Sequence, residues 1–254
     1  MRSYAQYCPI AKASEVLGDR WTLLIVREML GGARGFNELQ RGLPGISRSV
    51  LTDRLRSLER AEIIERRTGP KGRTLEYRLT RAGRDLEAVV QAMGEWGVTW
   101  SFTDPRPEEL DPDLLIVWMA RHVDREQLPP DRTVVQFDFR EPAKRYWMVL
   151  EPSEVSVCLQ HPGFDVDLKV GVDTATLYRV YLGRAGLGGA MRARKLTLSG
   201  PRLLQRGFGR WFAWSAFAPA SRESDERRRA ASRLANPERV RVEQPLPRSR
   251  RSGA

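Results

Sequence analysis

Residues 35–58 read GFNELQRGLPGISRSVLTDRLRSL, and this stretch decides the fold of the N-terminal part of the chain. Residues 35–39 predict a short amphipathic helix, and residues 42–46 predict a turn because they contain two glycines and a proline. Ser47 suits the start of a second helix, since its hydroxyl can cap free backbone amides. Apolar residues at helical spacing give the second helix one apolar face, made by Val50, Leu51, Leu55 and Leu58.

The opposite side of the second helix is polar or basic, which suits a helix that enters the major groove of DNA. An ordinary amphipathic helix with a solvated face has the same pattern, so this helix alone leaves both interpretations open. The candidate DNA-binding residues in this region are Arg34, Ser47, Arg48, Ser49, Thr52, Asp53 and Arg56.

A β-hairpin is predicted directly after the second helix. Residues 63–67 and 75–79 are strand-like, and residues 68–73 form a tight turn that carries Lys71 and Arg73. Residues 60–84 include eight basic and three acidic side chains. A positive hairpin tip can bind phosphates while the neighbouring helix reads bases. The order of helix, turn, helix and basic hairpin therefore predicts a winged helix-turn-helix domain that binds double-stranded DNA.

A long apolar stripe follows the hairpin, and we expect it to pair two copies of the chain. A small winged-helix core could not readily cover such a stripe, and two-fold pairing would place the recognition helices ~34 Å apart. Packing against the C-terminal half of the same chain is the alternative. The stripe consists of Leu86, Val89, Val90, Met93, Trp96 and Trp100.

The full chain of 254 residues is long enough for two domains. Two prolines within a charged cluster at 104–109 predict a linker, which leaves a DNA-binding and dimerisation domain over 1–103. An α+β domain is expected over 110–218, with a helix near 113–123 and strands at 133–139, 146–150, 155–159 and 165–170 in one sheet. Residues 219–254 are expected to form a basic disordered tail with a short helix near 225–234.

The net charge of +11 lies mainly at the two ends of the chain. Basic residues exceed acidic ones by five in 1–103, by one in 104–218 and by five in 219–254. This distribution favours a polyanionic partner for the ends, although a solvated basic surface has the same composition.

Enzyme chemistry is not expected from this sequence. Its only histidines are His122 and His161, and it contains neither a zinc motif nor a phosphate-binding loop. We therefore predict no catalytic residues, no metal and no cofactor. No apolar run is long enough to span a membrane, and the first residues do not resemble a signal peptide. We expect a cytoplasmic protein without a membrane partner.

The N-terminal part, over about residues 4–102, resembles HxlR-type regulators. The resemblance implies a dimeric winged-helix transcription factor that binds operator DNA, often at inverted-repeat half-sites. The motifs that carry it are YCPI at 7–10, LGDRWT at 17–22, GFNEL at 35–39, GIS at 45–47, LTDRLRSLE at 51–59 and YRLT at 77–80, with Trp96.

The same resemblance draws attention to Cys8, because some members of the family use a matching N-terminal cysteine as a redox or electrophile sensor. Reactivity requires the thiolate, which nearby positive charge such as Lys12 or Arg20 would favour. The alternative is a small buried apolar residue. Cys158 lies in a predicted strand and is expected in the core.

Residues 110–218 resemble the sterol-carrier-protein fold through GFDVDLKV at 163–170, DTATLYRVYLGR at 173–184, KLTLSGP at 195–201 and FGRWF at 208–212. The resemblance implies an α+β domain around an apolar cavity for a lipid or another hydrophobic molecule. Each aromatic candidate can equally be ordinary core. The candidate lining residues are Trp118, Phe137, Phe139, Trp147, Leu177, Tyr181, Phe208, Trp211, Phe212 and Trp214.

Together these patterns predict a dimeric repressor whose operator affinity responds to a hydrophobic ligand in the C-terminal domain. One alternative is a regulator that senses oxidants or electrophiles through Cys8. The other is a lipid-binding carrier whose N-terminal domain serves only assembly. DNA binding separates the two regulators from the carrier.

Overall fold

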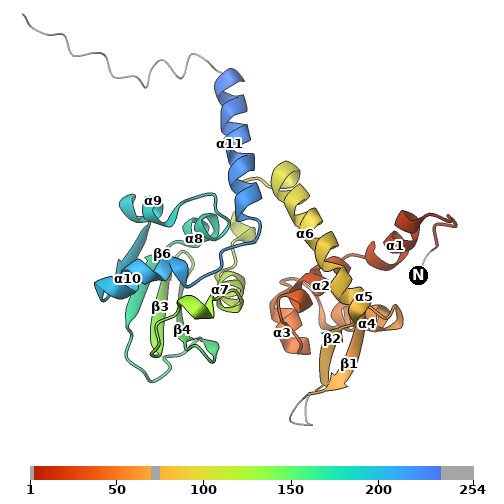
Figure 1. The fold of residues 1–254 in the computed structure, drawn as a ribbon, viewed down its shortest axis with the longest axis horizontal. Coiled ribbons are helices and arrows are strands. Elements are labelled where there is room, and N and C mark those ends of the chain that lie inside the picture. Colours follow the sequence, from red (N-terminus) through yellow and green to blue (C-terminus); the bar gives the residue numbers. More distant parts are fainter. Residues whose placement is uncertain (1–2, 70–74, 236–254) are drawn as a thin grey trace, which may run out of the picture.

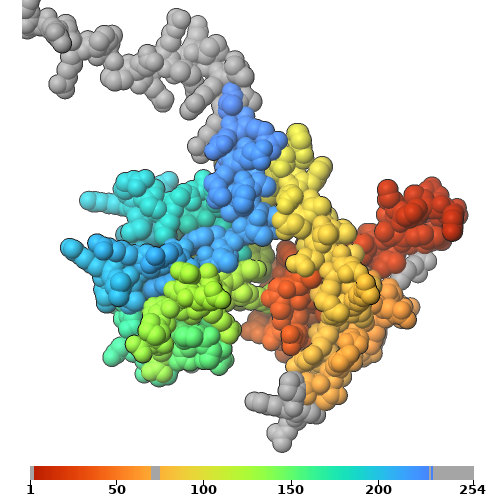
Figure 2. Space-filling model, in the orientation of Figure 1, coloured from red at the N-terminus to blue at the C-terminus, as the bar shows by residue number. Residues whose placement is uncertain are grey.

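The computed structural model describes residues 3–69 and 75–235, which fold into two domains (Figures 1 and 2). The domains meet along α2 (Thr22–Leu30), α6 (Glu87–Trp96) and α11 (Ala218–Ala235). The first domain contains the predicted winged helix-turn-helix. Its elements in chain order are α1 (Pro9–Leu17), α2 (Thr22–Leu30), α3 (Phe36–Arg41), α4 (Arg48–Arg60), β1 (Ile64–Thr68), β2 (Leu75–Leu79), α5 (Arg81–Asp85) and α6 (Glu87–Trp96), which continues into a π-helical turn over Gly97–Ser101.

The first domain has an apolar core of its own, formed mainly by α2, α3 and α4. Three residues of the predicted apolar face of α4 are buried, namely Leu51, Leu55 and Leu58. The prediction is wrong for Val50, which is 37% exposed. One residue corresponds to about 100° of rotation along an α-helix, so Val50 lies beside the buried stripe.

The second domain is built on a five-stranded mixed sheet, which confirms the prediction of a mixed helix and sheet structure. The strand order is β5-β4-β3-β6-β7, in which β3 and β6 are parallel and the other neighbours antiparallel. The strands are β3 (Thr133–Arg140), β4 (Ala143–Leu150), β5 (Val155–Cys158), β6 (Leu168–Val172) and β7 (Leu196–Ser199). The helices are α7 (Pro112–Arg121), α8 (Thr174–Tyr181), α9 (Leu187–Arg192) and α10 (Arg202–Gly207), with short 3-10 turns at Pro107–Glu109, Arg125–Gln127 and Phe208–Arg210.

Successive side chains of β3 point to opposite faces of this sheet, as in any β-strand. Phe137 and Phe139 point into the main core with the helices, whereas Val134 joins a smaller cluster with Trp147 on the other face. Cys158 is half-buried against that smaller cluster. One face of the sheet therefore holds most of the apolar packing of the domain.

The short helix predicted near residues 225–234 is present but longer, because α11 spans Ala218–Ala235, so the prediction of disorder is wrong for this first part of the tail. Arg184 holds Asp225 through two bonds of 3.0 and 3.1 Å, and the Ser224 hydroxyl donates to the Thr99 carbonyl at 3.3 Å. Ser221 is also buried, so small side chains let α11 pack closely where the sequence shows no aromatic residues. Figure 2 shows α11 in blue beside α6 in yellow. Residues 236–254 lie outside the described part.

Candidate functional site

Two glycines shape the turn between α3 and α4. Gly45 has φ of +84°, in the left-handed region that favours glycine. Gly42 packs so closely on α2 that an added Cβ would lie 1.8 Å from Oε2 of Glu28. This turn therefore fixes the direction in which α4 leaves α3.

Ser47 caps α4 as predicted, since its Oγ accepts a hydrogen bond from the Val50 amide at 3.2 Å. The Ser47 and Ser49 hydroxyls are also 3.0 Å apart and share a hydrogen bond. Both side chains are exposed at the N-terminal end of α4. Polar groups thus gather at the tip of the helix that would meet DNA.

Replacing Ser47 with alanine is expected to lower the free energy of unfolding by about 1 kcal/mol, because one amide at the helix start loses its acceptor. Urea denaturation measures this change. Ser47→Asp is the matched control and should stay near the wild-type value, since a carboxylate also caps. Equal stability of the alanine variant and the wild type would show that the cap contributes nothing.

The outward face of α4 brings together most of the predicted DNA-binding residues. Asp53 and Arg56 are exposed and form an ion pair of 3.7 Å that is open to solvent. Thr52 is half-buried, and its hydroxyl donates to the Arg48 carbonyl at 2.8 Å. Arg48 itself lies over the ring of Phe36 at 4.8 Å. Arg48 is thus held against α3 and lies apart from the free surface of α4.

Arg34 connects the helix-turn-helix to the hairpin. Its carbonyl accepts from the Tyr77 amide at 2.9 Å, and its own amide donates to Glu38 at 2.9 Å. Burial opposes ionisation of Glu38, but the amides of Arg34 and Gly35 lower the pKa of this carboxyl. The hairpin strands pair from Ile64 with Leu79 to Thr68 with Leu75. Lys71 and Arg73 lie outside the described residues.

Positive charge remains available around α4. Arg66 and Arg67 of the hairpin bond to Glu59 and Glu65 at 2.7 Å each. Within residues 3–69 and 75–235, by contrast, Arg34, Arg41 and Arg60 are exposed and form no ion pair. Unpaired arginines beside a polar helix are suited to phosphate contacts.

The structure divides the predicted apolar stripe into two parts. Leu86 and Val90 are half-buried against the core of the first domain. The others lie on one side of α6 and its continuation, at spacings of four, three and four residues. They are the exposed side chains of Val89 (44%), Met93 (58%), Trp96 (62%) and Trp100 (70%).

The C-terminal half packs on the other side of α6. An added Cβ at Gly94 would lie 2.2 Å from the ring of Phe217, so these two residues are in close contact. Packing within the same chain, the alternative interpretation, therefore accounts for one side of α6. It does not cover the exposed stripe.

A second exposed apolar surface lies on and before α1, and the sequence prediction missed it. Figure 1 shows α1 projecting from the first domain. Tyr7 is fully exposed, Ile10 is 77% exposed and only Ala11 of this helix is buried. The sequence signal for this surface was the presence of aromatic and aliphatic residues, Tyr7 and Ile10, in a short segment at the edge of the domain.

Cys8 lies at the N-terminal end of α1 and is half-buried and free. The positive groups expected beside it are engaged elsewhere. Lys12 forms an ion pair with Glu15 at 3.1 Å, and the Arg20 guanidinium lies 5.1 Å from the centre of the Trp21 ring.

Most of the residues predicted to line a ligand pocket inside the second domain belong to its apolar core, where side chains pack against one another. Trp147 lies on the opposite face of the sheet, and Trp214 packs against the outside of the main core. The candidates buried in the main core are Phe137, Phe139, Leu177, Tyr181, Phe208, Trp211 and Phe212.

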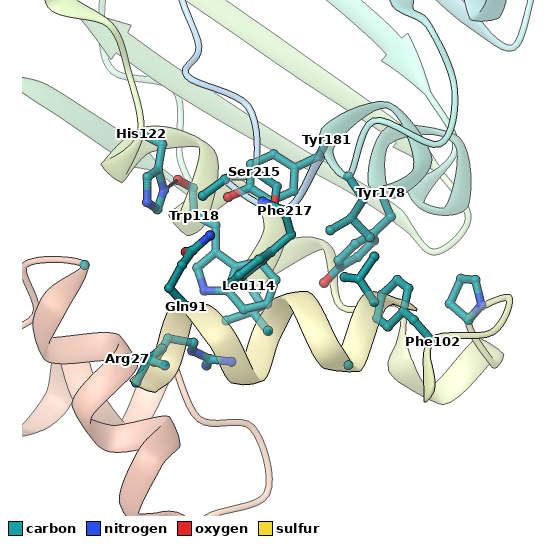
Figure 3. A pocket seen from close by; sticks show the side chains of 18 of the residues that line it. Arg27, Gln91, Phe102, Leu114, Trp118, His122, Tyr178, Tyr181, Ser215 and Phe217 are labelled. Carbon is teal, nitrogen blue, oxygen red and sulfur yellow. Dashed lines mark hydrogen bonds between the residues drawn. The ribbon is translucent and has the colours of Figure 1, made fainter. Parts of the chain in front are cut away.

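Two of the candidates, Trp118 and Tyr181, line a cavity of about 720 Å³ between the domains (Figure 3). Residues of α2 and α6 form one side of this cavity, and residues of α7 and α8 form the other. The cavity therefore depends on contacts between domains that lie far apart in the sequence.

A buried carboxylate joins the two domains at this cavity. Glu28 is 2% exposed and accepts from Arg27 of its own helix at 2.7 and 3.1 Å. It also accepts from Arg121 of α7 at 2.5 Å. The sequence prediction did not include this cluster, although the adjacent charges at 27 and 28 interrupt the otherwise apolar helix TLLIVREML.

Comparison with known proteins supports the N-terminal assignment. The model of the HxlR-like helix-turn-helix family matches residues 16–104. The HTH-type transcriptional regulator Mb3122 of Mycobacterium bovis is 43% identical over 102 residues, which are 39% of this chain and 61% of that protein. This chain thus spans less than two thirds of the mycobacterial relative.

Two proteins of Bacillus subtilis also match. The reduced form of the transcriptional regulator YodB is 35% identical, with 38% of this chain and 96% of that chain covered and a TM-score of 0.34. The HTH-type transcriptional regulator YvaP is 34% identical over 105 residues, which are 39% of this chain and 97% of that protein. The family match and the nearly complete coverage of YvaP show that the chain belongs to the HxlR-like helix-turn-helix family of transcriptional regulators.

Proposed function

We propose that the chain is a dimeric, sequence-specific DNA-binding repressor in which α4 reads bases and the hairpin contacts the phosphate backbone. The observation that supports this most is the outward face of α4, where Ser49, Thr52, Asp53 and Arg56 stand opposite the buried leucines. A 13-residue helix is about 20 Å long, and the major groove of B-DNA admits such a helix.

Dimerisation in this proposal uses the exposed stripe of α6 together with the exposed apolar surface of α1. Monomeric proteins rarely leave large apolar patches uncovered, and a two-fold axis buries the same patch on both copies. The two α4 helices would then enter adjacent major grooves about 10 base pairs apart. Such a dimer would occupy an inverted repeat.

Genomic DNA binding tests the proposal. The purified full chain is mixed with sheared genomic DNA from the organism that encodes it, and retained fragments are sequenced. We expect a small set of enriched fragments that share an inverted repeat. Retention of all fragments alike, or of none, would contradict sequence-specific binding and favour a carrier whose N-terminal domain serves only assembly.

The second domain is proposed to sense a small apolar molecule. Its α+β architecture and its resemblance to the sterol-carrier-protein fold support this role. A ligand changes operator affinity only if it binds the DNA-competent and DNA-incompetent states unequally.

A redox route through Cys8 is a separate proposal, supported by the half-buried free thiol at the N-terminal end of α1. Diamide should release wild-type protein from the enriched fragments, and Cys8→Ser should remain bound. Cys158→Ser is the matched control and should still be released. Equal release of the wild type and Cys8→Ser would exclude this route.

A further inference from the structure

We infer that the cavity between the two domains is an effector site for a small aromatic anion, and that occupancy is transmitted to subunit pairing through α6. The binding half of this inference stands on the cavity alone. The regulatory half rests on the proposed function of the protein as a dimeric DNA-binding regulator.

The cavity has the size and lining of a small-molecule site. Its volume of about 720 Å³ lies within the range of roughly 300–1,000 Å³ that is typical of such sites. Figure 3 shows aromatic side chains entering it from several segments, including Phe102 after α6, Trp118 on α7 and Phe217 before α11. A largely apolar wall built by both domains favours a ligand that contacts both.

The aromatic rings are arranged for stacking. Trp118 and Tyr181 lie 6.3 Å apart between ring centres at an interplanar angle of 24°, and Tyr178 meets Trp118 edge-on at 6.5 Å. Aromatic rings favour these offset and edge-on geometries. The Arg27 guanidinium lies over the Trp118 ring at 5.2 Å and Tyr181 is 5% exposed, so a flat aromatic ligand would pack against the edges of this cluster.

The cluster around Arg27 favours an anion, although Glu87 and Glu109 also line the cavity. Two guanidinium groups, Arg27 and Arg121, share the single carboxylate of Glu28, which leaves one positive charge in excess within this cluster. Arg27 Nη1 makes no hydrogen bond to any residue in 3–69 or 75–235. A partly buried guanidinium with a free donor is suited to a carboxylate or sulfonate.

Tyr181 adds a neutral donor to the same site. The side chain is 5% exposed and lines the cavity, and burial raises the pKa of Tyr181 to about 12. The hydroxyl therefore stays protonated at neutral pH. An anion held by Arg27 could accept a further hydrogen bond from this group.

The α6 helix connects the cavity to the dimer surface. Gln91, Gly94 and Gly97 line the cavity, whereas Met93 and Trp96 belong to the exposed stripe on the other side. A ligand that moves α6 would therefore move the stripe with it. Because both α4 helices are oriented through this stripe in the dimer, occupancy would alter their spacing on DNA.

Gly97 provides a way to fill the cavity without disturbing its walls. It lines the cavity, and an added Cβ would meet no atom within 4 Å. Gly189 in α9 is a helical glycine with the same freedom that lies outside the cavity. Gly97→Phe is thus the test variant and Gly189→Phe its matched control.

The probes are 8-anilinonaphthalene-1-sulfonate and its uncharged counterpart N-phenyl-1-naphthylamine, which differ by the sulfonate group. The wild type should bind the sulfonate about fivefold more tightly than the neutral probe, as expected for one partly screened charge. Gly97→Phe should weaken sulfonate binding by about tenfold or more because the phenyl ring occupies its place. Gly189→Phe should bind like the wild type.

Arg27→Met separates charge from shape. It should retain the neutral probe and lose the preference for the sulfonate. Equal wild-type affinity for both probes, or unchanged binding by Gly97→Phe, would overturn the assignment. If near-UV circular dichroism shows that Gly97→Phe does not fold, sulfonate binding is measured with Gly31→Leu instead. Gly31 lines the cavity at the C-terminal end of α2, and its added Cβ would have only ordinary contacts at 3.5 Å.

The regulatory half is measured on the enriched genomic fragments. Saturating sulfonate probe should change the fragment affinity of the wild type and leave that of Gly97→Phe unchanged. No change in the wild type would overturn this half. If the protein binds no fragment, the proposed function fails, and probe binding still tests whether the cavity is a ligand site. If fragments are bound but Gly97→Phe binds the probe like the wild type, only the assignment of the cavity fails.

Discussion

Replacing Trp96 with alanine is expected to raise the dimer dissociation constant about a thousandfold. A tryptophan at the centre of an interface contributes roughly 2 kcal/mol, and a two-fold interface loses this contribution twice. Trp96 is 62% exposed within one chain and lies in the middle of the stripe formed with Met93 and Trp100. Sedimentation equilibrium over a range of protein concentrations measures the change.

Leu203→Ala is the matched control, because Leu203 on α10 is 80% exposed and lies outside the stripe. We expect this variant to dimerise like the wild type. The monomeric stability of Trp96→Ala should also remain close to that of the wild type, since an exposed side chain contributes little to the core. A wild type that is monomeric at all concentrations, or a Trp96→Ala dimer of unchanged affinity, would refute pairing through α6.

Replacing Glu28 with alanine is expected to lower the free energy of unfolding by about 3 kcal/mol, because it leaves two guanidinium groups without their shared carboxylate. The arginine side chains are 34% and 19% exposed, so solvent limits the cost. Contact between α2 and α7 should loosen as well. Urea denaturation and limited proteolysis between the domains measure the two effects.

Glu108→Ala provides the comparison, because Glu108 pairs with Arg106 at 3.5 Å on the surface, where both side chains are more than 60% exposed. Surface pairs contribute little to stability, and this variant should unfold like the wild type. A loss below about 1 kcal/mol for Glu28→Ala would mean that the cluster does not hold the domains together.

Local sequence signals were sufficient for the helix-turn-helix. Gly45 and Ser47 act within a few residues of their positions, through a left-handed turn and a helix cap, so their roles are readable from the sequence. The two strand-like runs of the hairpin, on either side of a tight turn, are also local signals. Val50 shows the limit of such prediction. A helical pattern identifies the apolar face of a helix, but it does not tell which residues at the margin of that face are buried.

Contacts between distant segments were not predictable by the same means. An aromatic residue that fills a core and one that lines a cavity have the same composition signal, so Phe137 and Trp118 could not be told apart. The bond between Glu28 and Arg121 joins residues 93 positions apart. Packing of α11 likewise depends on Arg184 and Thr99, which no local pattern connects to it.

In vitro selection from a random duplex library, performed with the wild type and with a Ser49→Ala, Thr52→Ala double variant, tests most directly whether α4 reads the sequence. The wild type should enrich an inverted repeat with half-sites about 10 base pairs apart. The variant should lose base preference at one symmetric position in each half-site while still binding DNA. Enrichment of the same motif by both proteins, or of no motif by the wild type, would contradict the account.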